Sequence, residues 1–262
     1  MQIYTHTLPG GAQLIGYLRD RTVEMPAFNT RPAILILPGG GYAWCSRREA
    51  DPVAMQFLQA GYNVFTLYYT CRSDETVPAL RWQPLIDAAG AILHIRRNAE
   101  QFGTDPAKIA ICGFSAGGHL ALSGAVLDIP GETAQQRPNA VILGYPVVTA
   151  GEFAHRGSFV QLAGSEDTAA QQVFTLEDKV NADTPPVFVW HTMEDETVPV
   201  ENTLLLLNAL HKAGVPCEAH LFEKGCHGTS ICTPEVDADS AHRHCWVQLA
   251  VEWLNDTFSF HA

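Results

Sequence analysis

The sequence predicts an α/β fold with a mostly parallel central sheet and helices on both of its faces. Short apolar runs alternate along the chain with longer segments of helical periodicity, which is typical of parallel strands joined by crossover helices. The chain has 262 residues, of which 47% are hydrophobic and 17% charged. This is enough apolar material for one sizeable core, so we expect a single domain over residues 1–262.

Each element is predicted by its local pattern. Residues 2–20 alternate loosely around Gly10 and Gly11, which predicts a hairpin at the sheet edge. Runs that predict strands, most of them continuously apolar as buried strands are, lie at residues 33–37, 63–69, 108–112, 140–145, 187–191 and 217–222. Apolar residues at helical spacing, or helix-length segments between strands, predict helices at residues 49–60, 84–102, 117–127, 201–213 and 245–254.

The segment 149–186 is less regular than the rest of the chain. Its periodicity fits neither a strand nor a long helix. We expect either a small cap over the functional site or a long connection within the domain.

Charge and composition restrict the partners of the protein. Lys and Arg number 16 against 28 Asp and Glu, a formal net charge of −12, which repels nucleic acid and anionic membranes. No apolar run approaches the roughly 20 residues of a membrane span, and the first residues lack the pattern of a signal peptide. The seven Cys, an odd number, favour reduced thiols. We therefore expect a cytoplasmic protein that binds neither nucleic acid nor membrane, of an oligomeric state that the sequence does not indicate.

Cysteine and histidine side chains gather near the C-terminus. They are Cys226, His227, Cys232, His242, His244 and Cys245. Their spacing matches no zinc-binding pattern. We expect no metal and no cofactor.

Residues 113–117 carry the clearest chemical signal. They spell Gly-Phe-Ser-Ala-Gly, a G-x-S-x-G motif that follows a predicted strand and opens a predicted helix. A strand that turns directly into a helix strains the backbone at the serine and presents its hydroxyl above the sheet. Small residues two positions to either side permit this turn. We therefore expect Ser115 to be a nucleophile.

A serine hydroxyl needs a base, and the base needs an acid that fixes its tautomer. His227 lies in a glycine-flanked loop after the last predicted strand, and Asp195 follows the strand 187–191. Glu194 and Glu196 are neighbouring alternatives for the acid. The order Ser115, Asp195, His227 is typical of one class of hydrolase. We expect His119 and His191 to be structural hydrogen-bonding groups.

Three glycines follow the first buried strand, in Pro38-Gly39-Gly40-Gly41-Tyr42. Glycine lets a backbone turn its N–H groups inward without a side chain in the way. We expect an oxyanion hole from the N–H groups of Gly40 and Gly41, together with that of Ala116.

With these residues in place, the chain resembles bacterial α/β-hydrolases of the esterase/lipase superfamily. More narrowly, it is similar to the acetyl xylan esterase-like and feruloyl-acetyl esterase-like group. The resemblance covers nearly all of residues 30–256. The segments that carry it are Pro-Gly-Gly-Gly-Tyr at 38–42, Asp-Pro-Ala-Lys-Ile at 105–109, Gly-Phe-Ser-Ala-Gly-Gly-His-Leu-Ala at 113–121, Asp-Glu-Thr-Val-Pro at 195–199 and His-Gly at 227–228.

The resemblance implies an α/β-hydrolase fold with a small cap or none, and a carboxylic ester hydrolase that acts on small acyl esters. In lipase-like relatives a His precedes the three glycines, and Pro38 stands there instead, which favours the acetylesterase-like group. Acetyl groups on xylo-oligosaccharides or other sugars are the implied substrates. Tyr42, Trp44 and Trp82 lie on or near the loops expected to rim the pocket, where they would either stack on a sugar or pack in the core.

Two other functions remain open from the sequence. A serine peptidase of the prolyl-oligopeptidase type would share the motif and the order of the triad, but it normally carries an additional propeller domain for which 262 residues leave no room. A non-catalytic binding module on the same fold would usually lack one member of the triad.

Overall fold

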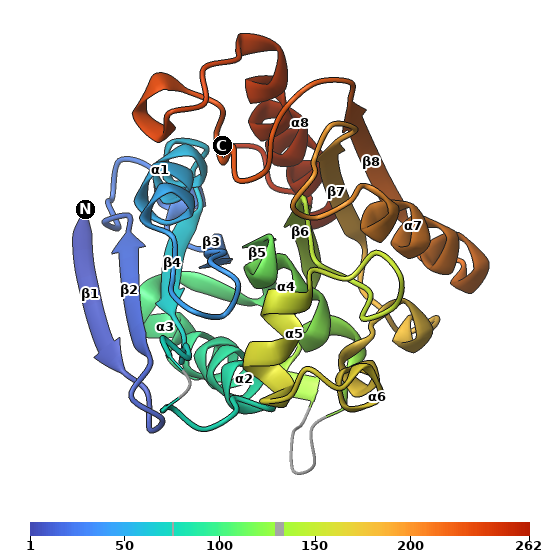
Figure 1. Ribbon diagram of the computed structural model, residues 1–262. Coiled ribbons are helices and arrows are strands. Elements are labelled where there is room, and N and C mark those ends of the chain that lie inside the picture. Colours follow the sequence, from blue (N-terminus) through green and yellow to red (C-terminus); the bar gives the residue numbers. More distant parts are fainter. Residues whose placement is uncertain (75, 129–133) are drawn as a thin grey trace.

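The computed structural model describes residues 1–74, 76–128 and 134–262. Its centre is an eight-stranded sheet with the strand order β1-β2-β4-β3-β5-β6-β7-β8 (Figure 1). β1 and β2 pair antiparallel, β2 pairs antiparallel with β4, and all other neighbours are parallel. The strands are β1 (Gln2–Thr7), β2 (Gln13–Leu18), β3 (Arg31–Leu37), β4 (Asn63–Tyr68), β5 (Thr104–Phe114), β6 (Ala140–Gly144), β7 (Val187–Thr192) and β8 (Cys217–Phe222).

Helices cover both faces of this sheet. Those in the described residues are α1 (Asp51–Gln59), α2 (Gln83–Arg97), α3 (Ala99–Phe102), α4 (Ala116–Val126), α5 (Arg156–Ala163), α6 (Thr168–Gln171), α7 (Glu201–Ala213) and α8 (Ala241–Phe258). Buried residues of α1 and α8 share one apolar cluster, and those of α2, α4 and α7 share the other. The predicted α/β fold with helices on both faces is thereby confirmed.

The central strand β3 shows why this arrangement is stable. All seven of its residues are buried. Ile34 and Ile36 belong to the cluster on the α1 and α8 side, whereas Leu35 and Leu37 belong to the cluster on the opposite side. Successive side chains of a strand point to opposite faces, so a continuously apolar strand requires a helical layer on each face.

Two elements differ from their sequence predictions. The helix expected over residues 84–102 is divided at Asn98 into α2 and α3, and the Asn98 side chain donates a hydrogen bond to the carbonyl of His94. Such a bond competes with the helical ladder. The strand expected at 108–112 extends to Thr104–Phe114, because the region before it pairs with β3 through Arg31 and Thr104 across an irregularity in register.

The order of the strands determines where a site can form. The chain passes from β3 to β4 on one side, and then crosses to β5 on the other side of β3. At such a switch point the connections leave in opposite directions, and the carboxyl ends of the two strands border a crevice. Both the glycine loop after β3 and Ser115 after β5 lie there.

The irregular segment 149–186 contains α5, α6 and short 3-10 turns. Backbone N–H groups of Leu80 and Arg81 donate to the carbonyls of Gln161 and Leu162, which attaches α5 to the loop before α2. Phe159 and Leu162 are buried in the main core. Among the described helices, none combines the length and the apolarity that a membrane crossing requires.

Candidate active site

Ser115 occupies a strained turn between β5 and α4. Its φ of 54° and ψ of −120° lie in a region that a residue with a side chain rarely adopts. The two flanking glycines make the turn possible, because a methyl group at Gly113 would lie 2.1 Å from the carbonyl oxygen of Gly117, and one at Gly117 would lie 2.2 Å from that of Leu37. The motif therefore raises the hydroxyl above the sheet.

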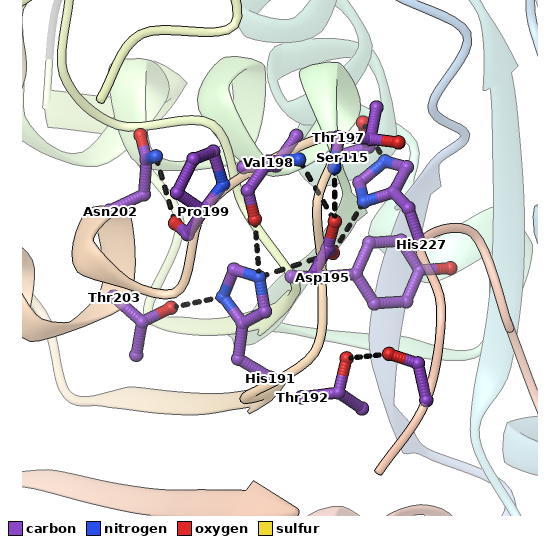
Figure 2. A network of polar contacts seen from close by, with 12 residues as sticks. Ser115, His191, Thr192, Asp195, Thr197, Val198, Pro199, Asn202, Thr203 and His227 are labelled. Carbon is purple, nitrogen blue, oxygen red and sulfur yellow. Dashed lines mark hydrogen bonds and ion pairs between the residues drawn. The ribbon is translucent and has the colours of Figure 1, made fainter. Parts of the chain in front are cut away.

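The structure brings Ser115, His227 and Asp195 into one hydrogen-bonded chain. His227 Nε2 lies 2.8 Å from Ser115 Oγ, and His227 Nδ1 lies 2.6 Å from Asp195 Oδ2 (Figure 2). These atoms come from the ends of three different strands, β5, β7 and β8. A carboxylate on Nδ1 holds the proton there, so Nε2 is free to accept the proton of the serine.

Asp195 is a buried carboxylate, 5% exposed, with several donors around it. Its Oδ1 accepts hydrogen bonds from the backbone N–H groups of Thr197 and Val198. Burial acts to raise the pKa of Asp195, but the bonds from His191, His227 and the Val198 backbone outweigh it and hold that pKa well below its usual range. Asp195 therefore stays ionised opposite His227.

His191 lies directly behind this carboxylate. Its Nε2 donates to the carbonyl of Val198 at 3.0 Å and lies 3.3 Å from Asp195 Oδ2, while the hydroxyl of Thr203 donates to Nδ1 (Figure 2). A carbonyl can only accept, so the proton of this buried ring is on Nε2. The sequence reasoning assigned His191 a structural role, and the ring in fact contacts the acid of the triad.

The glycine loop after β3 presents unoccupied backbone donors beside Ser115. Gly39 N–H is bonded to the carboxylate of Glu49, whereas the N–H groups of Gly40, Gly41 and Ala116 find no acceptor among the described residues. Gly40 and Gly41 have φ of 123° and 63°, and a methyl group at Gly40 would lie 2.2 Å from the carbonyl oxygen of Trp44. Glycine is therefore required for this loop to turn its donors toward the cavity.

The sequence did not predict a role for Glu49, whose carboxylate is hydrogen-bonded to the glycine loop after β3. This carboxylate is 3% exposed, and besides the Gly39 N–H it accepts a hydrogen bond from the Tyr145 hydroxyl at 2.6 Å. The same hydroxyl accepts from Ser230 N–H, in the loop that carries His227, and the Tyr145 ring packs edge-on against the His227 ring at 4.9 Å between centroids. Glu49 and Tyr145 thus connect the glycine loop to the loop of the base. The feature of the sequence that could have identified Glu49 is a charged residue at the start of an apolar helical segment.

A cavity of about 350 Å³ opens above the triad. Its wall includes Ser115 and His227, the glycine loop and the first residues after it, and part of α5 with the residues before it. The lining residues are Gly40, Gly41, Ala43, Trp44, Ser46, Arg48, Glu49, Ser115, His155, Gly157, Gln161, Thr197, His227 and Gly228.

The three aromatic residues expected at the rim have different positions. Trp44 lines the cavity and is 63% exposed. Tyr42 is 1% exposed, and its hydroxyl is hydrogen-bonded to His119, while Trp82 packs on Phe174 against the core. Tyr42 and Trp82 are therefore not among the residues that line the cavity.

The remaining histidines near the site have other partners. His119 donates from Nε2 to the carbonyl of Phe174 and accepts from Tyr42 at Nδ1. Burial lowers the pKa of His119 to about 4, against the opposing effect of that carbonyl. His244 bonds to the carbonyl of Ile231. Within the described parts of the chain, no three His, Cys, Asp or Glu side chains form a group that could hold a metal ion.

The chain is similar to several known proteins and protein families. Residues 91–259 match the prolyl oligopeptidase family, and residues 23–145 match the BD-FAE family. The chain is 39% identical over 235 residues to endo-1,4-beta-xylanase B of Butyrivibrio fibrisolvens, covering 85% of this chain and 35% of that protein. It is 29% identical over 232 residues to an acetylxylan esterase of Xylanibacter ruminicola, covering 86% of this chain and 45% of that protein. The chain thus spans less than half the length of these two relatives.

A solved structure is similar over almost the whole chain. The acetyl ester-xyloside bifunctional hydrolase from Caldicellulosiruptor lactoaceticus superposes with a TM-score of 0.81 at 33% identity, covering 97% of this chain and 91% of that one. The fold is that of the α/β-hydrolase superfamily. Within it, the chain belongs to the prolyl oligopeptidase family, and it is similar to acetylxylan esterases and to an acetyl ester-xyloside hydrolase.

Proposed function

We propose that the protein is a serine carboxylic ester hydrolase that acts on small acyl esters, acetyl esters above all, through a covalent acyl-enzyme. The observation that carries the proposal is the continuous chain of hydrogen bonds from Ser115 through His227 to Asp195. Three backbone donors for which the described residues supply no acceptor, those of Gly40, Gly41 and Ala116, add to it. The similarity to an acetylxylan esterase supports acetyl groups on xylo-oligosaccharides or related sugars as the substrate.

The residues have distinct roles in acylation. His227 Nε2 removes the proton of Ser115 as the hydroxyl oxygen attacks the ester carbonyl, and Asp195 stabilises the imidazolium that results. The N–H groups of Gly40, Gly41 and Ala116 donate to the oxyanion, for which each donor typically contributes about a hundredfold or more in rate. The alcohol then leaves with the proton held on His227.

Deacylation reverses these roles with water as the nucleophile. His227 removes a proton from water, which attacks the acyl-enzyme carbonyl, and the oxyanion again lies against the three N–H groups. Collapse of this intermediate returns the proton to Ser115 and releases the acid. The chain's own residues supply every proton transfer in this scheme.

The match to the prolyl oligopeptidase family favours one second candidate, the hydrolysis of short peptides by the same triad. Initial rates on short chromogenic peptides, beside those on acetyl esters, separate the two activities. Turnover of acetyl esters without peptide cleavage supports the esterase. Peptide cleavage without ester turnover would replace it.

The decisive experiment compares the parent with Ser115→Ala on p-nitrophenyl acetate, butyrate and octanoate. We expect acetate to be preferred and the variant to retain less than about 1% of parental kcat/KM, since the proposed mechanism requires the Ser115 hydroxyl as its nucleophile. Ser123→Ala, in the same helix α4, is the matched control and should remain active. Activity that persists in Ser115→Ala would refute the proposal, and rates that rise toward octanoate would move the preference away from acetyl groups.

A further inference from the structure

Helix α5 and the residue before it form one wall of the cavity above Ser115. His155, Gly157 and Gln161 all line that cavity. Nothing in the triad chemistry requires these side chains, and they belong to the segment 149–186 that the sequence left without a role. Both polar side chains are half-buried and carry hydrogen-bonding groups.

The contacts of His155 fix its tautomer. The backbone N–H of Ser158 donates to His155 Nδ1, which caps the N-terminus of α5, and Ser158 Oγ lies 2.8 Å from the same nitrogen. Because Nδ1 accepts from a backbone N–H, the proton of the neutral ring is on Nε2. No acceptor for this Nε2–H is present among the described residues.

The side-chain amide of Gln161 is also oriented by a hydrogen bond at one end. The guanidinium of Arg72 donates to Gln161 Oε1 at 3.1 Å, so that oxygen faces the arginine and the amide Nε2 faces away from it. The two Nε2–H groups have no acceptor among the described residues. Leu80 N–H also bonds to the Gln161 carbonyl, which holds this position of α5 against the loop before α2.

The imidazole of His155 lies close to the reacting atoms. A methyl group at Gly41 would lie 3.7 Å from His155 Cε1, so the ring contacts the glycine loop that carries the proposed oxyanion donors. Burial above all, and then the electrostatic interaction with His227, lower the pKa of His155, with Asp195 acting in the opposite direction. The ring is therefore a neutral donor at pH 7.

We propose that His155 Nε2–H and the Gln161 amide form the subsite for the alcohol part of the ester, and that this part is an uncharged polyhydroxylated ring, a sugar. The inference rests on the proposed esterase activity on sugar esters and extends it to the residues that recognise the sugar. Each side chain is fixed at one end by the protein and presents a neutral donor at the other, which is what hydroxyl and ring oxygens require. The exposed indole of Trp44 lines the same cavity and offers a flat apolar face for a sugar ring.

The test compares two acetyl esters that differ in the alcohol. Phenyl acetate carries no hydroxyl on its alcohol side, whereas acetylated xylobiose carries several. The variants are His155→Asn, which keeps an N-cap acceptor for α5 but removes the ring donor, and Gln161→Met, which keeps the side-chain length but removes the amide. For each, we expect the ratio of kcat/KM on acetylated xylobiose to kcat/KM on phenyl acetate to fall about three- to tenfold, mainly through KM.

A second measurement does not depend on sugar-ester turnover. Xylobiose should inhibit phenyl acetate hydrolysis by the parent competitively, and its inhibition constant should rise about three- to tenfold in both variants. Gln59→Met, at an exposed position of α1 outside the cavity, is the matched control and should leave the ratio and the inhibition constant at parental values.

The outcomes separate the subsite from the activity. A parent that hydrolyses phenyl acetate but neither hydrolyses acetylated xylobiose nor binds xylobiose overturns the sugar subsite and leaves the esterase intact. Equal losses on both esters in the two variants also overturn it, because the residues would then support the triad rather than the alcohol. A parent inactive on every ester overturns the proposed function itself, and the subsite with it.

Discussion

At the scale of single residues, two buried carboxylates organise the site. Asp195 and Glu49 are 5% and 3% exposed, and each accepts at least one hydrogen bond from a backbone N–H group and one from a side chain. An unpaired buried charge costs several kcal/mol, so such groups persist only when their partners are complete. In the proposed mechanism, Asp195 orients the base, and Glu49 holds the loop that presents the oxyanion donors.

Removing one partner of Glu49 tests this second role. Tyr145→Phe deletes the hydroxyl that donates to Glu49 and accepts from Ser230 N–H, and leaves both groups buried and short of a partner. We expect the free energy of unfolding to fall by about 2–3 kcal/mol, and kcat on acetyl esters to fall about tenfold because the glycine loop shifts. Urea denaturation and initial rates measure the two effects.

Tyr17→Phe is the control for that substitution. Its hydroxyl also donates to a carboxylate, that of Asp51, but at the surface, where water replaces the lost bond. We expect less than about 1 kcal/mol of destabilisation and parental kcat. Equal effects of the two substitutions would show that the buried network around Glu49 has no special role.

At the scale of elements, α5 and α7 end in the same way. Gly164 and Gly214 follow them in the left-handed conformation, with φ of 67° and 69°, the usual helix ending for glycine. Their surroundings differ. A methyl group at Gly164 would lie 2.5 Å from Ala79 Cβ, whereas one at Gly214 would have no atom within 4 Å.

Alanine substitutions at Gly164 and Gly214 separate the destabilisation caused by backbone strain from that caused by a packing clash. Gly214→Ala should cost about 1 kcal/mol for the left-handed backbone alone. Gly164→Ala should lower the free energy of unfolding clearly more than Gly214→Ala does. It should also lower kcat/KM, because relief of the clash moves α5 and with it the wall of the cavity. Thermal unfolding and ester kinetics give both values. The double variant Ala79→Gly/Gly164→Ala should return to the stability of Gly214→Ala, and its failure to do so would contradict the packing argument.

At the scale of the whole molecule, three histidines and one aspartate have a pKa that folding lowers. Burial lowers the pKa of His94 and His155, and lowers that of His119 to about 4. Hydrogen bonds hold the pKa of Asp195 below its usual range in spite of burial. In each case the unfolded chain takes up a proton at a pH where the native protein does not, so acid favours unfolding.

We therefore expect stability to be fully present near pH 7.5 and to fall in two steps. The histidines act first, below about pH 6.5, with His119 contributing about 3 kcal/mol by pH 4, and Asp195 acts below about pH 4. Urea midpoints at pH 7.5, 5.5 and 4.5 measure the slope. His119→Phe should be less stable at pH 7.5 but flatter in its pH dependence, while His211→Phe at the surface should keep the parental slope. An unchanged slope in His119→Phe would contradict this account.

Local sequence patterns predicted most of the fold and the three residues of the proposed triad. The continuously apolar runs could only be buried strands, and their Gly and Pro endings located the loops. Ser115, Asp195 and His227 could be found because each follows a different strand, and the carboxyl ends of parallel strands lie at one edge of a sheet. The division of one helix at Asn98 was missed because the helical spacing of apolar residues continues across it, through Ala99 and Phe102.

Only the tertiary structure decided which residues surround the proposed triad. Glu49 is buried only because Tyr145, 96 positions away in the sequence, meets it across the sheet. His155 and Gln161 reach the cavity because α5 is attached to the loop before α2, and Tyr42 and Trp82 leave it because His119 and Phe174 take up their side chains. Local periodicity records which face of an element is apolar, whereas the partner of a polar or aromatic side chain depends on distant segments that meet only in the folded protein.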